Sequence, residues 1–212
     1  KTSLESHNLA LVSLSKLLKT KKEIKRIEAY DNSHTSGKNS VGVMVVADKE
    51  GLSPKNYRKF NIRYDLKNKN ISKVDDYYMM EEVLTRRLSK IDKKVESPIP
   101  DVIIIDGGRG QFNSVLKILK KYQLENINLL SVSKGPERNA GREIIHLENQ
   151  NLNLKPNDSL LNFIQRLRDE AHRFAITAHR SRRSKSSIKS IFDEIKGIGP
   201  KRKKDLLLHF GT

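Results

Sequence analysis

Cysteine and tryptophan are absent from this chain of 212 residues, and basic side chains far outnumber acidic ones. The lack of cysteine excludes a disulfide framework and any metal site built on thiolates. No apolar run approaches the length of a membrane span, and no apolar segment near the N-terminus marks a signal peptide. We therefore expect a cytoplasmic protein without membrane segments.

The charge balance is the strongest compositional feature. Lysine and arginine number 42 against 25 aspartates and glutamates, which gives a formal net charge of +17. Such an excess indicates an anionic partner, above all nucleic acid, because phosphates supply affinity that is independent of base sequence. The alternative is a lysine-rich organism whose proteins carry solvated basic surfaces, and charge alone does not decide between the two.

Apolar periodicity predicts one sizeable α/β unit with smaller parts at each end. In chain order we predict a helix at 8–22, strands at 23–31, 40–48 and 56–64, a helix at 75–91, a strand at 102–106 with a helix after its glycine turn, a strand at 127–135, a hairpin within 142–156 and a long helix at 158–183. Three meandering strands followed by alternating helices and strands is the element order of a ribonuclease H-like fold, a mixed sheet flanked by helices. We divide the chain into an N-terminal helix or linker at 1–22, this domain at 23–181, and a basic linker with a small helical unit at 182–212.

Two aspartates are placed at predicted strand ends. Asp31 ends the first strand, and Asp106 ends the apolar strand at 102–106, which lacks alternation and is expected to be covered on both faces. Ligands of α/β sheets sit at the carboxyl ends of central strands. If the two strands are neighbours, the carboxylates repel each other, and Mg²⁺ or Mn²⁺ between them would remove that cost. The alternative is that each aspartate only caps a turn or a helix.

The long helix carries a polar stripe beside its apolar face. Gln165, Arg168, His172 and His179 follow one another at helical spacing, so the stripe can face the strand ends. His172 is then available as a metal ligand or a general base, or it is an ordinary surface histidine. Asp76, in the first turn of the helix at 75–91, is either a further acid of the site or a favourable partner for the helix dipole.

Basic and glycine-rich segments supply candidate contacts to DNA. Three glycines in the turn DGGRGQ allow backbone amides to approach an anion closely. The candidate phosphate contacts before the terminal unit are His34, Arg109, Lys134, Arg168, Arg180, Arg182 and Arg183. In the terminal segment GIGPKRKKDLLLHFG, Gly197 and Gly199 line a turn that Lys201 and Arg202 follow. This pattern is typical of a helix-hairpin-helix, which binds the DNA backbone without reading sequence.

These blocks together resemble a known family. YDNSHTSG, DDYYMMEEVLTRR, PDVIIIDGGRGQ, SVSKG, RLRDEAHRFAITAHRSRRSK and GIGPKRKKDLLLHFG are similar, in order, to the C-terminal half of the UvrC family, and the resemblance covers residues 23–211. UvrC is the incising subunit of the bacterial UvrABC excision nuclease. The resemblance implies a ribonuclease H-like endonuclease domain that cuts 5′ to a lesion in double-stranded DNA during nucleotide excision repair. It also implies Asp31, Asp106 and His172 as the catalytic, metal-binding triad, with Asp76 as a further acid.

Two departures from the family pattern stand out. Tyr30 and Asn32 flank Asp31 where the family's FDISH block has phenylalanine and isoleucine, and a second hairpin after Thr212 is missing. We therefore expect a fragment of a longer protein, with the segment that docks on the UvrB–DNA complex lying upstream. Two other functions stay open: a related nuclease acting on a four-way junction or an RNA–DNA hybrid, and a non-catalytic DNA-binding module.

Overall fold

The computed structural model describes residues 3–35, 38–62, 76–92, 98–135 and 143–193, together with the isolated positions 199, 202, 205 and 209. In these described ranges, none of the helices is long and apolar enough to cross a membrane.

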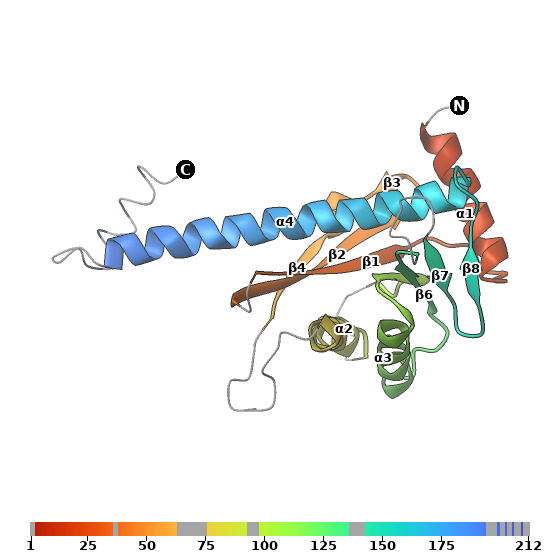
Figure 1. Ribbon diagram of the computed structural model, residues 1–212, viewed down its shortest axis with the longest axis horizontal. Helices are drawn as coiled ribbons and strands as arrows, with labels where there is room; N and C mark the ends of the chain where they lie inside the picture. Colours follow the sequence, from red (N-terminus) through yellow and green to blue (C-terminus); the bar gives the residue numbers. More distant parts are fainter. Residues whose placement is uncertain are drawn as a thin grey trace.

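One mixed sheet organises the molecule (Figure 1). Its strands are β1 (Ile27–Thr35), β2 (Lys38–Asp48), β3 (Gly51–Leu52), β4 (Arg58–Asn61), β5 (Val102–Asp106), β6 (Asn128–Ser133), β7 (Ile144–His146) and β8 (Asn151–Asn153). They lie in the order β3-β2-β1-β5-β6-β7-β8, and β4 pairs with β2 as well. The predicted meander is confirmed by the antiparallel β1–β2 and β2–β4 pairs, and the predicted hairpin by β7–β8. Parallel pairing of β5 with β1 and β6 makes the sheet mixed.

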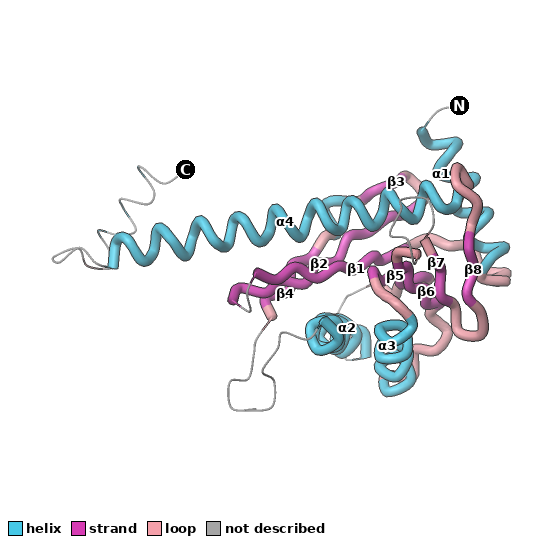
Figure 2. Tube along the Cα trace, in the orientation of Figure 1, coloured by secondary structure: helices cyan, strands magenta, loops and turns pink. Residues whose placement is uncertain are grey.

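Helices cover both faces of this sheet (Figures 1 and 2). The helices are α1 (Ser3–Leu17), α2 (Asp76–Asp92), α3 (Arg109–Lys121) and α4 (Ser159–Asp193), with a short 3-10 turn, η1, at Pro54–Asn56. α4 lies across one face over β1 and β2, and α1 packs beside the start of α4. α2 and α3 lie together on the opposite face. The predicted architecture, a ribonuclease H-like sheet between helices, is confirmed.

The centre of the sheet is β5. Val102 and the three isoleucines that follow it are at most 1% exposed. A strand without alternation is therefore covered on both faces, as expected for a strand between parallel neighbours. Asp106, the last residue of β5, therefore lies in the middle of the sheet.

Two helices differ in extent from the prediction. α1 begins at Ser3, before the predicted start at residue 8. It ends at Leu17 rather than at residue 22, because Lys19 adopts a left-handed φ of 50° and the Thr20 amide donates to the Ser15 carbonyl, which closes the helix. α4 starts where predicted, with the Asp158 carboxylate accepting from the Leu160 amide at 2.8 Å. It continues through the segment expected as a linker to Asp193, so that its C-terminal end projects beyond the sheet (Figure 1).

Candidate active site

Parallel pairing of β1 and β5 brings two aspartates together. Tyr30 is opposite Ile105 in the register, so Asp31 and Asp106 are the next residues on adjacent strands and share one face. The predicted meeting of these two strands is confirmed, but Asp31 is not the last residue of its strand. β1 separates from β5 after Tyr30 and continues to Thr35 along β2. Asp31 therefore lies where the parallel neighbour ends rather than where the strand ends.

Burial and a neighbouring acid both act on the carboxyl group of Asp31. The residue is 8% exposed, and burial is the main cause that raises the pKa of its carboxyl group above the ordinary value. The charge of Asp106 raises this pKa further, while hydrogen bonds from His172 and the Asn32 amide oppose the rise. A carboxyl group whose pKa is raised by a second carboxylate would also be stabilised as its anion by a metal cation placed between the two.

α4 places one polar side chain over each of three carboxylates on the sheet. His172 Nδ1 lies 3.1 Å from Asp31 Oδ2. Arg168 contacts Asp106 Oδ1 through Nη2 at 2.9 Å and Nε at 3.2 Å. Gln165 Nε2 donates to Glu143 Oε1 at 2.9 Å. The predicted stripe is confirmed from Gln165 to His172, and the side chain of His179 falls outside the described residues.

Glu143 is the residue that sequence reasoning missed. It directly precedes β7, is 6% exposed, and its Oε1 lies 3.7 Å from Arg168 Nη1. In the sequence it is one acid of a short predicted hairpin, and nothing in the spacing links it to α4. The only available signal is an acidic side chain beside a buried strand, which requires a partner when it is desolvated.

The donor set suits a hard divalent cation. Asp31 and Asp106 offer the carboxylate oxygens that Mg²⁺ and Mn²⁺ favour, and a cation would relieve the repulsion that raises the pKa of Asp31. Among the described residues, however, no three His, Asp or Glu side chains are arranged to hold a metal. In this arrangement the Arg168 guanidinium contacts Asp106 Oδ1. The two aspartates are thus the residues here whose chemistry suits a divalent cation.

Other predicted site residues are placed with less detail. Asp76 is the first residue of α2 and is exposed, so both of its proposed roles stay predictions. Lys134 directly follows β6 and is exposed. The positions whose side chains lie outside the described residues are His34, Arg180, Arg182, Arg183, Gly197 and Lys201. Gly199 and Arg202 are described only as exposed positions, so the helix-hairpin-helix stays a prediction.

Arg109 does not have the surroundings of a phosphate contact. Its guanidinium donates to the carbonyls of Leu147 and Gln150 and, at 2.6 Å, to Asn151 Oδ1. These acceptors belong to the turn between β7 and β8 and to the first residue of β8. A planar guanidinium matched to several acceptors is held in place, so Arg109 fastens the hairpin to the start of α3. The predicted phosphate contact is not supported by these bonds.

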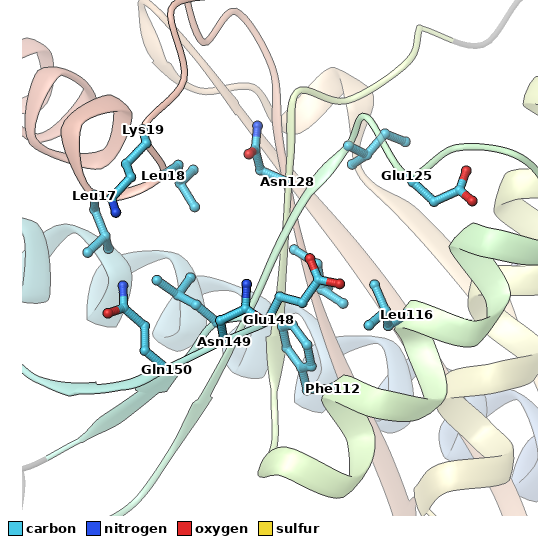
Figure 3. Close-up of a pocket in the computed structure, with 13 residues that line it drawn as sticks. Leu17, Leu18, Lys19, Phe112, Leu116, Glu125, Asn128, Glu148, Asn149 and Gln150 are labelled. Carbon is cyan, nitrogen blue, oxygen red and sulfur yellow. The ribbon is translucent and has the colours of Figure 1, made fainter.

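A separate cavity of about 320 Å³ lies away from these carboxylates (Figure 3). Leu17 and Leu18 at the end of α1, Phe112 and Leu116 on α3, and the turn at 148–150 line it. Neither Asp31, Asp106, Glu143 nor α4 contributes to its wall. The carboxylate pair beneath α4, rather than this cavity, is therefore the candidate active site.

Comparisons with known proteins agree with the motifs. The family described as "UvrC RNAse H endonuclease domain" matches residues 15–176. UvrABC system protein C of Zymomonas mobilis subsp. mobilis is 52% identical over 192 residues, which cover 88% of this chain and 28% of that protein. The same protein of Paramagnetospirillum magneticum is 49% identical over 194 residues, covering 88% and 30%. This chain therefore spans less than a third of the length of these relatives. Among solved structures, human ENDOV is similar with a TM-score of 0.47 and 13% identity, over 87% of this chain and 100% of that one.

Proposed function

The chain belongs to the UvrC RNase H endonuclease domain family, and on this basis we propose that it is a metal-dependent DNA endonuclease making the 5′ incision beside a lesion. The observation that carries the proposal is the carboxylate pair: Asp31 and Asp106 on adjacent strands, with the pKa of Asp31 raised by burial and by its neighbour. Helix capping does not explain a mutually repelling pair beneath a basic helix.

The residues divide the chemistry among themselves. Asp31 and Asp106 would hold Mg²⁺ or Mn²⁺, which when bound activates a water and stabilises charge on the scissile phosphate. The hydrogen bond between His172 and Asp31 uses Nδ1 of the imidazole. Nε2 has no hydrogen bond within the described part of the chain. With Asp31 accepting from Nδ1–H, Nε2 is the basic nitrogen and can take a proton from water. The alternative role of His172 is a third metal ligand.

The DNA substrate would be held by basic side chains at some distance from the two aspartates. We place the duplex along the projecting part of α4, where Arg180, Arg182 and Arg183 lie, with Lys134 near the strand ends. The terminal segment with Gly197, Gly199, Lys201 and Arg202 would grip the backbone as a helix-hairpin-helix. Recruitment to lesion DNA by a UvrB–DNA complex in the bacterial cytoplasm belongs to the same proposal, through segments of the longer relatives that this chain does not span.

The test is incision of a nicked lesion duplex in Mn²⁺ by the chain and its variants. We expect Asp31→Asn and Asp106→Asn to abolish incision and His172→Ala to lower the rate by about 10²–10⁴-fold, as for loss of a general base, while DNA binding survives. Asp158→Asn, a substitution of the same kind at the N-cap of α4, is the matched control and should cut normally. Near wild-type incision by either aspartate variant would refute the metal assignment. Preferred cutting of a four-way junction or an RNA–DNA hybrid would keep the nuclease but replace the substrate.

A further inference from the structure

Arg168 bridges two carboxylates, that of Asp106 at the end of β5 and that of Glu143, which directly precedes β7. It lies 2.9 Å from Asp106 and 3.7 Å from Glu143, and its own side chain is 13% exposed. Asp106 is much more open than Glu143, with side-chain exposures of 35% and 8%. The Arg168 guanidinium therefore pairs with two carboxylates at once, the partly exposed one of Asp106 and the buried one of Glu143.

The contact with Asp106 conflicts with metal binding. Both contacting nitrogens of Arg168, Nε and Nη2, converge on Oδ1 of Asp106. A guanidinium does not lose its proton in proteins, so it cannot reduce the conflict by becoming neutral. Repulsion between a unit charge and a divalent charge is strong at a site that water screens only partly. Arg168 must therefore move away from Asp106 before a divalent cation can bind there.

Glu143 offers a place for the guanidinium to move to. Its Oε1 already lies 3.7 Å from Nη1, so a short displacement converts the present ion pair into a direct hydrogen bond. Gln165 donates to that same Oε1 at 2.9 Å and so fixes the carboxylate. Because Glu143 is buried, its charge is costly without a cation close by. The buried carboxylate thus favours the displaced position of Arg168.

We propose that Arg168 is a movable counter-ion that sits on Asp106 in the metal-free protein and shifts to Glu143 when a divalent cation binds. Glu143 is then a positioning residue for the metal site, which it affects only through Arg168. This inference rests on the proposed function, since it takes Asp106 as a metal ligand.

The test is calorimetric titration of the metal-free 212-residue chain with Mn²⁺, which needs no DNA and no turnover. Arg168→Gln should bind Mn²⁺ about tenfold more tightly or better, because the competing charge is gone. Glu143→Gln should bind several-fold more weakly, because Arg168 loses its alternative partner and stays on Asp106. In the double variant, the loss caused by Glu143→Gln should vanish, since it acts only through the arginine.

Controls separate this effect from damage to the fold. Arg166→Gln removes a charge from an exposed position of the same helix, where the guanidinium stacks on Phe163, and should leave Mn²⁺ affinity unchanged. Arg168→Lys keeps the charge without the fork, so it should bind Mn²⁺ more weakly than Arg168→Gln. Thermal melts verify that each variant is folded, and the Lys variant retains the comparison if Gln proves unstable.

The outcomes distinguish the two levels of the argument. Unchanged or weaker Mn²⁺ binding by folded Arg168→Gln, beside a wild type that binds, overturns the movable counter-ion and leaves the nuclease proposal intact. A Glu143→Gln loss that persists in the double variant overturns the role of Glu143, because it would then act on the metal directly. A folded wild type that binds no Mn²⁺ at all refutes the proposed function, and this inference falls with it.

Discussion

A buried ion pair on the far side of β1 gives the sharpest test of how the active site is held. Glu28 is fully buried, and Arg87 of α2 donates to it at 2.6 Å and 3.1 Å. The Tyr30 hydroxyl donates to the same carboxylate at 2.6 Å, and Arg87 also reaches the Pro98 carbonyl at 2.6 Å. The cluster therefore ties β1, which carries Asp31, to α2 and to the segment leading into β5, which carries Asp106.

The expected cost of breaking this cluster follows from its burial. Removing one member of a buried pair leaves an uncompensated charge and costs about 3–5 kcal/mol. Arg26 stays bonded to Glu28 at 2.8 Å, so we expect Arg87→Met to lie near the lower end, at about 3 kcal/mol. For a chain of this size, that corresponds to a fall in Tm of roughly 6–12 °C.

Urea unfolding of the variant, followed by circular dichroism, measures this cost. Adding Glu28→Gln to Arg87→Met should recover part of the loss, because the buried charge that lacked a partner has been removed. Arg86→Met is the matched control: its side chain is 40% exposed and pairs with Glu82 along the helix, so it should cost less than about 1 kcal/mol. A loss below about 1 kcal/mol for Arg87→Met, or no recovery in the double variant, would contradict this account of the cluster.

Two further predictions concern DNA binding and a buried amide. Changing Arg180, Arg182 and Arg183 together to Gln should reduce the steepness of log affinity against log salt concentration by up to about 3. Changing the exposed Lys120 and Lys121 of α3 to Gln is the control and should leave this slope unchanged. An unchanged slope for the arginine variant would show that this stretch does not contact DNA. Asn32 buries both side-chain polar atoms without a partner in the described structure, so Asn32→Ile should raise the free energy of unfolding by about 1–3 kcal/mol, and a fall would show that the amide is satisfied.

Sequence reasoning was strongest where one local pattern has one structural solution. The unbroken apolar segment before Asp106 predicted a central strand, and the spacing from Gln165 to His172 predicted a stripe facing the strand ends; both are confirmed. It was weaker where the outcome depends on partners far along the chain. Arg109 follows a glycine turn as a phosphate ligand would, yet the hairpin turn some forty residues later supplies its acceptors. Glu143 could not be identified from the sequence because its ion-pair partner, Arg168, lies on a helix that follows later in the chain.

β1 shows why residue type alone does not identify a catalytic acid. Glu28 and Asp31 are both buried acids of one strand, and their odd spacing directs them to opposite faces. Glu28 meets Arg26, Arg87 and a tyrosine hydroxyl, so its charge is compensated by the fold itself. Asp31 is close to a second carboxylate and contacts one histidine, so no arginine or lysine compensates its charge among the causes that act on its pKa. A buried acid whose pKa is raised by a second acid is the kind of residue that we propose for catalysis, because burial for stability alone favours a paired cation or an apolar side chain.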